Sequence, residues 1–476
     1  MRKTKIICTM GPNTNDRQLM KELILQGMDI ARFNFSHGDY EEQKSRLDLL
    51  KSLRDELNIT VAALLDTKGP EIRTGALKDD KKVLLETGGT YTLTTREIIG
   101  DHQIGHINYK GLTEDVSTGN RILIDDGLIE LVVEKVNGED IICHIANGGE
   151  LGSKKGVNVP NVSIKLPSLT QKDKEDILFG IEQGFDFIAA SFVRNAECIY
   201  EIKQILEANK ADLSVIAKIE NAEGIKNMDA IIEASDGIMV ARGDMGVEIP
   251  PEQVPFIQKE LIRKCNERSK PVITATQMLD SMIRNPRPTR AEVTDVANAI
   301  YDGTDAIMLS GETAMGKYPV EALKIMGQIA EFTEEKLDYH EYHNRTLTAH
   351  KKSISNTVSR SSVFTALALD AKVIVAPTMS GFTARLVSKW RPQALIVGMS
   401  PSITSVRKMQ LYWGVKPFHA KRAESTDALI KSSVDVVKEH GFAKAGDILV
   451  LTAGVFSAED KNTSKGVTNM MRIVTV

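Results

Sequence analysis

The sequence predicts an α/β protein built on a barrel of eight parallel strands, with an all-β insert and a second, smaller α/β domain. Three observations carry this prediction. Short apolar runs rich in Val, Ile and Ala alternate with amphipathic stretches of helical period, polar residues stand at the end of nearly every run, and one long segment lacks helical period altogether. In a TIM-type (β/α)8 barrel such strand ends converge on one face.

The first part of the barrel is predicted from three βα units in a row. Strands are expected at Lys5–Gly11, Ile30–His37 and Val61–Gly69, and helices near 16–26 and 41–58. The runs are apolar throughout rather than alternating, as expected of strands that are buried on both faces of a parallel sheet.

The residue pattern of the sequence changes after Gly69. Residues 83–160 are dense in Gly, Thr, Val and Ile, and they contain no long helical period. An Asn137-Gly138 pair within this segment is a strong hairpin signal. We therefore predict an inserted all-β domain.

The barrel pattern then resumes with a helix from Gln171 and five further strands. Three strands before the insert and five after it give the eight that close a barrel. The five are expected at Phe187–Arg194, Ser214–Asn221, Gly237–Asp244, Pro271–Leu279 and Ala306–Thr313.

A polar, His-containing connector is expected at 337–353, followed by a smaller α/β domain with strands at KVIVAP, ALIVGMS, DILVLTAG and MRIVTV. The predicted domains are 1–70 with 168–340 for the barrel, 71–167 for the insert, and 341–476 for the C-terminal domain. We find no repeat at a fixed period. At 476 residues the chain is long enough for two to four domains.

Composition excludes several classes of protein. Lys and Arg number 60 against 64 Asp and Glu, a formal net charge of −4, which argues against a general nucleic-acid binder. No stretch approaches the roughly 20 apolar residues of a membrane helix, and the N-terminus lacks a signal sequence. The four cysteines include no CxxC pair, so free thiols and a cytoplasmic location are expected. They are Cys8, Cys143, Cys198 and Cys265.

Lys218, Glu220 and Asp244 form the main candidate site. Strand alternation places Lys218 and Glu220 on one side of their strand, and Asp244 ends the next strand, so the two carboxylates can share one cation. Two carboxylates with water and substrate oxygens commonly hold Mg²⁺. A lysine beside the ion adds positive charge where a phosphoryl group or an enolate develops negative charge. For a lone Lys or Glu a structural ion pair is the commoner explanation, but convergence over successive strands favours a site.

A second group of polar residues surrounds the ends of the second and third strands. Their amide, hydroxyl and carboxylate oxygens suit an alkali or alkaline-earth ion rather than zinc, and two arginines could act as phosphate forks. Asn-x-Ser near a strand end can equally be helix-capping chemistry. Thr276, at the end of the seventh strand, could bind a carboxylate or relay a proton, or serve only a structural purpose. The group is Arg32, Asn34, Ser36, Asp66, Thr67, Glu71 and Arg73.

Taken together, several segments resemble the pyruvate kinase family, and the resemblance runs from Thr4 to Val476. There is no Walker A sequence, Rossmann fingerprint, G-x-S-x-G elbow or H-E-x-x-H motif to suggest another family. The resemblance also leads us to expect that the extra C-terminal domain of some bacilli is absent. The matching segments are ARFNFSHG, LLDTKGPEIRTG, GSKKGVNVP, AKIENAEG, MVARGDMGVEIP, ATQMLDSMIRNPRPTRAEVTDVANAI and MLSGETAMGKYP.

The resemblance implies transfer of phosphate from phosphoenolpyruvate to ADP, giving pyruvate and ATP. It implies that Glu220 and Asp244 bind Mg²⁺ or Mn²⁺, and that Lys218 stabilises the transferring phosphoryl group and the enolate. Substrate contacts are implied at Arg32, Gly243, Asp244 and Thr276, with Arg32, Lys218 and Thr276 as the catalytic set. A monovalent cation site is implied at Asn34, Ser36, Asp66 and Thr67, and nucleotide contacts at Asn34, His37, Arg73 and Lys155.

Three further expectations follow from the resemblance. Glu71 is the residue type of K⁺-dependent members, so K⁺ dependence is expected. The insert resembles the family's mobile lid, whose Lys154 and Lys155 would approach the nucleotide phosphates; the alternative for this pair is a solvated loop. The donor that protonates the enolate is left open, with Thr276 acting through water as one suggestion.

The C-terminal segment TMSGFTARLVSKWRP combines small hydroxylated residues with a following helix, an arrangement suited to phosphate. The family uses a similar loop for a sugar-phosphate effector, and it implies a homotetramer. The tryptophan of fructose-1,6-bisphosphate-responsive animal and yeast members has no counterpart here, so the effector's identity stays open. The candidate effector residues are Thr378, Ser380, Gly381 and Thr383.

Two other functions are weighed against an active kinase. A Mg²⁺-dependent barrel lyase or aldolase could use the same carboxylates but would not explain the insert or the C-terminal domain. A catalytically inactive sugar-phosphate or nucleotide sensor would be expected to have lost Lys218 or a metal ligand, and none is lost.

Overall fold

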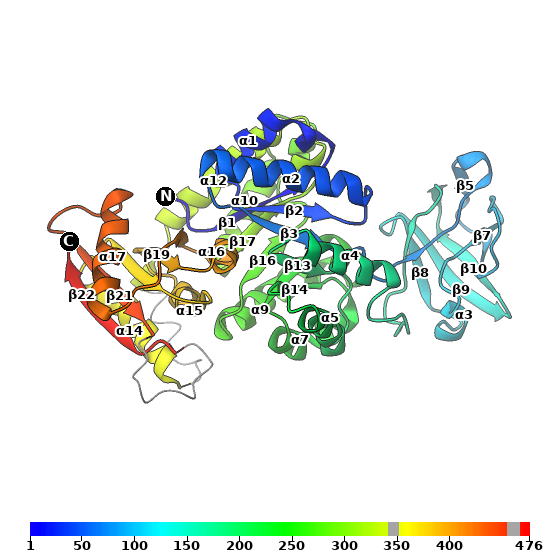
Figure 1. The fold of residues 1–476 in the computed structure, drawn as a ribbon. Coiled ribbons are helices and arrows are strands. Elements are labelled where there is room, and N and C mark those ends of the chain that lie inside the picture. Colours follow the sequence, from blue (N-terminus) through cyan, green and yellow to red (C-terminus); the bar gives the residue numbers. More distant parts are fainter. Residues whose placement is uncertain (341–351, 455–466) are drawn as a thin grey trace.

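The computed structural model describes residues 1–340, 352–454 and 467–476. Three parts lie in a row: the β-rich insert at one end, the barrel in the middle, and the C-terminal α/β domain at the other end (Figure 1). The predicted fold class is confirmed. The exact domain boundaries stay predictions, and the predicted connector at 337–353 falls mostly outside the described residues.

The central part is a closed barrel of eight parallel strands in the order β1-β17-β16-β15-β14-β13-β3-β2. All eight predicted strands are present. Their bounds are β1 Lys5–Met10, β2 Ile30–Asn34, β3 Ala62–Asp66, β13 Phe187–Ala190, β14 Ser214–Ile219, β15 Gly237–Ala241, β16 Val272–Ala275 and β17 Ala306–Leu309.

Helices surround the barrel, and strand alternation divides the apolar residues between two cores. Ile6 and Cys8 face the helices, whereas Ile7 faces the barrel interior, because neighbouring side chains of a strand point to opposite faces. The helices are α1 Arg17–Leu25, α2 Tyr40–Leu57, α4 Gln171–Glu182, α5 Ala196–Ala208, α6 Ala222–Lys226, α7 Met228–Ala234, α8 Arg242–Glu248, α9 Val254–Glu267, α10 Arg290–Asp302, α11 Gly311–Ala314 and α12 Pro319–Glu335.

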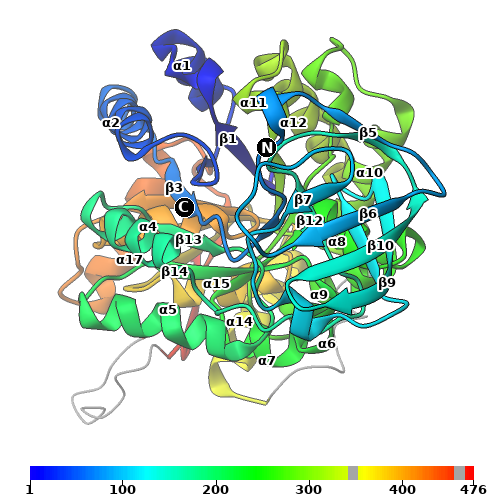
Figure 2. The same cartoon turned by 90° about the vertical axis from the view of Figure 1, so that its right-hand side faces the viewer.

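The insert between β3 and α4 is almost entirely β, as predicted. It forms a seven-stranded sheet in the order β4-β12-β8-β9-β10-β6-β7 and a two-stranded sheet of β11 and β5. The expected hairpin joins β9 to β10, with Gly138 at a φ of 62° in the turn. The insert stands over one end of the barrel (Figure 2). Its elements are β4 Ile72–Arg73, β5 Val83–Leu85, β6 Thr90–Thr94, β7 Ile104–His106, α3 Leu112–Asp115, β8 Arg121–Ile124, β9 Ile129–Asn137, β10 Asp140–Asn147, β11 Gly149–Leu151 and β12 Gly156–Asn158.

The C-terminal domain has a five-stranded sheet in the order β20-β19-β18-β21-β22. Four of these strands were predicted, and β20 was not. Its segment, VKPFH, contains Pro417, which sheets tolerate mainly on an edge strand, and β20 is an edge strand. The elements are α14 Ile354–Ala368, β18 Val373–Pro377, α15 Phe382–Lys389, β19 Leu395–Ser400, α16 Ile403–Lys408, β20 Val415–His419, α17 Thr426–Glu439, β21 Ile448–Ala453 and β22 Met470–Thr475.

Every predicted barrel strand runs past its observed carboxyl end, by one residue for β1 and by four for β13, β16 and β17. The strand before Asp244 is the case that bears on the site. The strand expected at Gly237–Asp244 ends at Ala241, and Arg242, Gly243 and Asp244 form the first turn of α8. The Arg242 guanidinium donates to the carbonyl oxygens of Ala275 and Thr276 at 3.1 and 2.7 Å, which ties this turn to the end of β16.

At the opposite end of the barrel, four aspartates repeat one arrangement; we call them the base aspartates. Each directly precedes a barrel strand and accepts a backbone N–H from the preceding barrel strand, and each lies within 4 Å of a basic side chain. Asp29 accepts from Ile6 and pairs with Arg2, Asp186 accepts from Ala63 and pairs with Arg54, Asp236 accepts from Val215 and pairs with Lys203, and Asp305 accepts from Val272 and pairs with Arg391.

Among the described residues, no helix is long and apolar enough to span a membrane.

Candidate active site

Lys218 lies near the carboxyl end of β14, on the side of the barrel that carries the insert. Its Nζ is 2.7 Å from Ser191 Oγ, 3.1 Å from Asp66 Oδ1 and 3.5 Å from Glu220 Oε2. These three neighbours come from the ends of β13, β3 and β14. The predicted convergence of successive strand ends is therefore present in the structure.

The charge of this lysine is stabilised despite its burial. Burial lowers the pKa of Lys218, but the carboxylates of Asp66 and Glu220 outweigh that effect and raise it above its usual value. Burial likewise opposes ionisation of Asp66, whereas Arg32 and Lys218 hold its pKa below the usual range. The centre is thus a buried ammonium facing a buried carboxylate.

Arg32 completes this network from β2. Its Nε donates to Asp66 Oδ2 at 2.6 Å, and its Nη1 donates to Thr9 Oγ1 at 3.0 Å. Arg32 is only 9% exposed, so its guanidinium is fixed before any ligand arrives. A fixed guanidinium near a phosphate-sized ligand loses little side-chain entropy on binding.

Glu220 carries an unsatisfied oxygen. Its Oε1 accepts a hydrogen bond from the backbone N–H of Phe192, but its buried Oε2 has no hydrogen-bond partner among the described residues. Burial and repulsion from Asp244, only partly offset by Lys218, raise the pKa of Glu220 to about 7. Such a group favours either a proton or a cation.

Asp244 is the second carboxylate of the predicted metal pair. Burial raises its pKa, and repulsion from Asp126 and Glu71 adds to that effect. No group of three or more His, Cys, Asp or Glu side chains suited to a metal occurs in the described part of the chain. Two carboxylates with one free oxygen fit a hard divalent cation that takes its remaining ligands from water and substrate.

Thr276 is held in an unusual backbone conformation. Its φ is 74° and that of Gln277 is 56°, in the left-handed region that a β-branched residue rarely adopts. A Cβ added at Gly243 would lie 2.8 Å from Thr276 Cγ2. The two predicted substrate residues are therefore in close contact, and only glycine permits this approach without displacement. Strain of this kind is concentrated at functional sites.

The residues predicted for a monovalent cation lie at the ends of two neighbouring strands. Asn34 of β2 is the register partner of Asp66 of β3. Asn34 Oδ1 accepts from the backbone N–H of Ser36 at 3.1 Å, and Thr67 Oγ1 accepts from that of Ser191 at 3.1 Å. The structure places Asn34 beside Asp66 and gives side-chain oxygens of Asn34, Asp66 and Thr67 protein donors.

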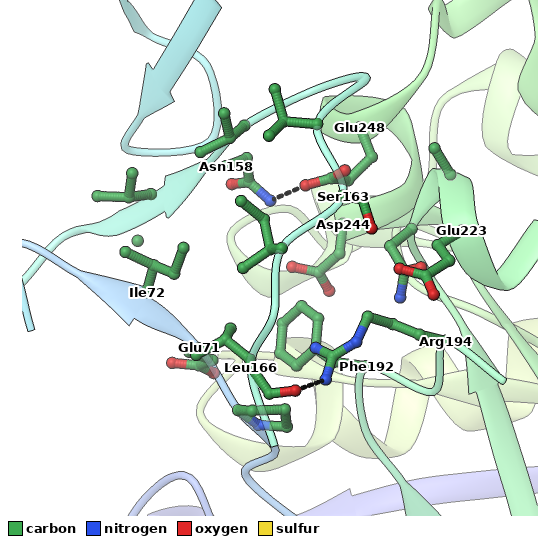
Figure 3. Close-up of a pocket in the computed structure, with 18 of the residues that line it drawn as sticks. Glu71, Ile72, Asn158, Ser163, Leu166, Phe192, Arg194, Glu223, Asp244 and Glu248 are labelled. Atoms are coloured by element: carbon green, nitrogen blue, oxygen red, sulfur yellow. Dashed lines mark hydrogen bonds between the residues drawn. The ribbon is translucent and has the colours of Figure 1, made fainter. Parts of the chain in front are cut away.

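A cavity of about 590 Å³ lies between the insert and the barrel. It contains Asp244 and the predicted nucleotide residues Arg73 and Lys155, whereas Asn34 and His37 are not among its lining residues. Figure 3 shows Asp244 with Glu71, Phe192 and Arg194 around this space.

Both basic side chains of this cavity are engaged. Arg73 Nε is 2.5 Å from Glu71 Oε2, and its Nη1 donates to the Lys154 carbonyl at 2.9 Å. Lys155 Nζ is 3.0 Å from Asp125 Oδ1. These partly exposed ion pairs would have to rearrange to accept a phosphate.

A side-chain hydrogen bond within this cavity joins β12 of the insert to α8 of the barrel. Asn158 Nδ2 donates to Glu248 Oε1 at 2.8 Å (Figure 3). Burial raises the pKa of Glu248, and the amide of Asn158 partly offsets this. The contact fixes the position of the insert relative to α8.

A second cavity of about 400 Å³ lies in the C-terminal domain. Thr378, Ser380 and Thr383 line it together with Lys421 and Arg422. Gly381 precedes α15 with a φ of 82°. The predicted effector residues therefore surround a cavity with two basic side chains.

Sequence reasoning missed Ser191, Thr9 and the role of Arg242. Ser191 follows the apolar run FIAA of β13, so the strand-end rule that identified Lys218 could have found it. Thr9 lies within β1, and Arg242 points away from the mouth to Asp295 at 2.7 Å, so no local pattern marked either one.

The sequence was compared with known families and proteins. A family model described as pyruvate kinase, barrel domain, matches residues 1–323, and one described as pyruvate kinase, alpha/beta domain, matches residues 356–474. Pyruvate kinases of Staphylococcus epidermidis and Staphylococcus aureus are 50% and 51% identical over 475 residues, 99% of this chain and 80% of theirs. A crystal structure of a pyruvate kinase from Cryptosporidium parvum has a TM-score of 0.94 and 38% identity, covering 100% of this chain and 96% of that one.

Proposed function

The chain belongs to the pyruvate kinase family, an enzyme family that converts phosphoenolpyruvate and ADP to pyruvate and ATP, and we propose that it does so at the Lys218 centre. The single observation that carries this assignment of the site is the buried, charged Lys218 between Asp66, Ser191 and Glu220.

In this proposal Lys218 and Arg32 bind the phosphoryl group of phosphoenolpyruvate. Their positive charges are preorganised around Asp66, so they stabilise negative charge as it develops, with little rearrangement. Gly243, Asp244 and Thr276 form the opposite wall and orient the substrate. The proton that converts the enolate to pyruvate is assigned to no side chain, and water held by Thr276 is one candidate.

Glu220 and Asp244 would hold Mg²⁺, or Mn²⁺ in its place. The buried Oε2 of Glu220, which accepts no hydrogen bond from a described residue, and the raised pKa of both carboxyl groups support this assignment. When bound, the ion would neutralise charge on the transferring phosphoryl group and on the enolate oxygen.

Asn34, Ser36, Asp66 and Thr67 would hold K⁺. Glu71 supports K⁺ dependence, because its carboxylate adds no positive charge of its own to the site. Equal activity with Mg²⁺ in sodium-free buffer with and without K⁺ would exclude this part of the proposal. Glu71→Lys is expected to make activity less dependent on K⁺.

The insert, with boundaries proposed at 71 and 167, would act as a lid. Arg73 and Lys155 would exchange their carboxylate partners for the phosphates of ADP when it closes, and Asn34 and His37 would contact the nucleotide from the barrel. Closure would exclude water from the enolate and strengthen local electrostatics.

A sugar phosphate is proposed as an activator at the cavity of Thr378, Ser380, Gly381 and Thr383, with Lys421 and Arg422 as anion-binding side chains. A homotetrameric assembly and a cytoplasmic location complete the proposal. A thermal-shift screen with candidate sugar phosphates, repeated with Arg422→Gln, would test the activator site.

The decisive experiment follows pyruvate formation from phosphoenolpyruvate and ADP in a coupled assay containing Mg²⁺ and K⁺. Turnover that requires both substrates is expected. Phosphoenolpyruvate consumption without ADP would instead support a lyase, and absence of turnover with retained ligand binding would support a sensor.

A further inference from the structure

A third cavity lies at the base of the barrel, where the C-terminal domain packs against the starts of the strands. Its volume is about 140 Å³. Ser214 and Asp236 line it from the barrel, and Ser380, Arg385, Lys408 and Tyr412 line it from the C-terminal domain. Figure 1 shows α15 and α16, which carry Arg385 and Lys408, on the side of that domain nearest the barrel.

Arg385 is the uncompensated charge of this cavity. Its side chain makes no hydrogen bond or ion pair with any described residue, and its Nε is buried without a partner. A buried donor without a partner is costly, and a guanidinium especially so. Some ligand or solvent must therefore satisfy it.

The other charged groups around the cavity are already paired. Lys408 Nζ is 2.5 Å from Asp212 Oδ1. Asp236 accepts from Lys203 at 3.1 Å and from the backbone N–H of Val215 at 2.8 Å, as one of the base aspartates. Arg385 therefore leaves the cavity with positive charge that no neighbouring carboxylate cancels.

Two further groups agree with a site for an anion. The Tyr412 hydroxyl lines the cavity and makes no hydrogen bond to a described residue, so it is free to donate. Nearby Lys270 donates to the Ser235 carbonyl at 2.5 Å. Burial lowers the pKa of Lys270, an effect that Asp236 opposes and Arg385 reinforces.

We propose that this cavity binds a small oxyanion of the phosphate type, held by the Arg385 guanidinium and the Tyr412 hydroxyl. The planar fork of arginine matches two phosphate oxygens. A volume of about 140 Å³ exceeds the ~30 Å³ share of one water several times and accommodates a single tetrahedral oxyanion.

This site is distinct from the proposed activator cavity but shares a wall with it. Ser380 and Phe382 line both cavities, whereas Lys421 and Arg422 line only the larger one and Arg385 and Tyr412 only the smaller. Variants in the unshared residues can therefore separate the two.

The test uses isothermal titration of the full chain with inorganic phosphate. Wild type is expected to show a binding event that Arg385→Gln weakens about 10-fold, because the charge-assisted hydrogen bonds are lost. Arg422→Gln, in the neighbouring cavity, is the matched control and is expected to leave this event unchanged.

Tyr412→Phe keeps the shape of the cavity and removes one donor, so it is expected to weaken binding about threefold. Folding of each variant is checked by circular dichroism. If Arg385→Gln does not fold, Tyr412→Phe alone tests the proposal. The proposal would be overturned if Arg385→Gln and Tyr412→Phe, or whichever of them folds, bound phosphate with wild-type affinity. Loss of the binding event in Arg422→Gln would also overturn it. So would the absence of any phosphate binding event in wild type.

Discussion

The side chains around Lys218 form a network of ion pairs. Two cations, Arg32 and Lys218, bind the two oxygens of Asp66, whereas Glu220 has one buried oxygen that accepts no hydrogen bond from a described residue. Both oxygens of Asp66 thus have hydrogen-bond donors within the protein. The free oxygen of Glu220 is the one that a bound cation would satisfy.

Lys218→Met is expected to abolish phosphoryl transfer while leaving metal binding largely intact. The substitution removes the positive charge beside the substrate but neither carboxylate. The coupled assay measures the first effect, and Mn²⁺ titration followed by electron paramagnetic resonance measures the second.

Lys174→Met is a suitable control, because Lys174 pairs with Glu201 on the surface at 42% side-chain exposure. Loss of Mn²⁺ binding together with activity in Lys218→Met would show that the lysine acts structurally.

At the residue level, the sequence placed side chains together where a periodic rule applied. Lys218, Glu220 and Asp66 follow from polar side chains at the ends of apolar runs. The hydrogen bond of Ser191 to Lys218 and the left-handed φ of Thr276 depend on how neighbouring strand ends meet, which no local pattern encodes.

Among the secondary-structure elements, the first turn of α8 sets the width of the site. Arg242 ties this turn to β16, and Gly243 contacts Thr276 at the end of that strand. The first turn of α8 can lie this close to the end of β16 because Gly243 has no side chain.

Gly243→Ala is expected to reduce kcat/KM about 10- to 100-fold with little change in thermal midpoint, because the new methyl would lie 2.8 Å from Thr276 Cγ2 and displace it. Gly246→Ala, in the same helix, is the matched control, since the nearest atom to its new methyl is 4.0 Å away. Steady-state kinetics of both variants measure the difference. Equal activity of the two would contradict the idea that this contact positions Thr276.

The contact between Asn158 of β12 and Glu248 of α8 joins the insert to the barrel. Asn158→Ala is expected to raise the KM for ADP several-fold, because the insert loses a bond that holds it over the cavity. Glu248→Gln keeps an acceptor oxygen and is expected to stay near wild type. A similar KM in all three proteins would show that this bond does not position the insert.

At this scale the sequence was a good guide to the existence of elements and a poorer guide to their ends. All eight barrel strands were found from apolar runs, but the strand expected to reach Asp244 stops at Ala241, where a helix begins. The edge strand β20 was missed because Pro417 and alternating polar residues conceal its apolar character.

In the molecule as a whole, the two ends of the barrel differ in character. The end below the insert gathers carboxylates, one of which, Glu220, has a buried oxygen without a hydrogen bond to a described residue, whereas the other end is fastened by the base aspartates. Asp305 also pairs with Arg391 of the C-terminal domain at 2.7 Å, so the same device attaches that domain. The sequence contains an Asp before each of these four strands, but their irregular spacing hides the repeat from a search at fixed period.

Asp29→Asn is expected to lower the thermal midpoint at neutral pH. Burial opposes ionisation of Asp29, but Arg2 and Lys5 outweigh it, so its pKa lies below the ordinary 3.8. The stabilisation is therefore present above about pH 4 and is lost as pH falls toward the lower, folded-state pKa. The expected loss at pH 7 is about 1–3 kcal/mol.

Thermal unfolding of wild type and Asp29→Asn, followed by circular dichroism between about pH 7 and pH 3.5, measures this effect, and the difference between the two midpoints is expected to shrink toward the acid end. Asp48→Asn, which breaks an exposed pair with Lys44, is the control and is expected to change stability by less than about 0.5 kcal/mol. A difference for Asp29→Asn that does not depend on pH would contradict the ionic explanation.

The base aspartate Asp186 suggests that the barrel can fold without the insert. The insert lies between β3 and β13, yet Asp186 joins these two strands directly through Ala63, and at their other ends the backbone N–H of Ser191 donates to Thr67 Oγ1 at 3.1 Å. The two strands are therefore fastened to each other at both ends without help from the insert. The catalytic scaffold and its cover are separable modules, so a short linker in place of residues 71–167 is expected to leave a folded barrel, and covers of other shapes could be grafted at the same junction.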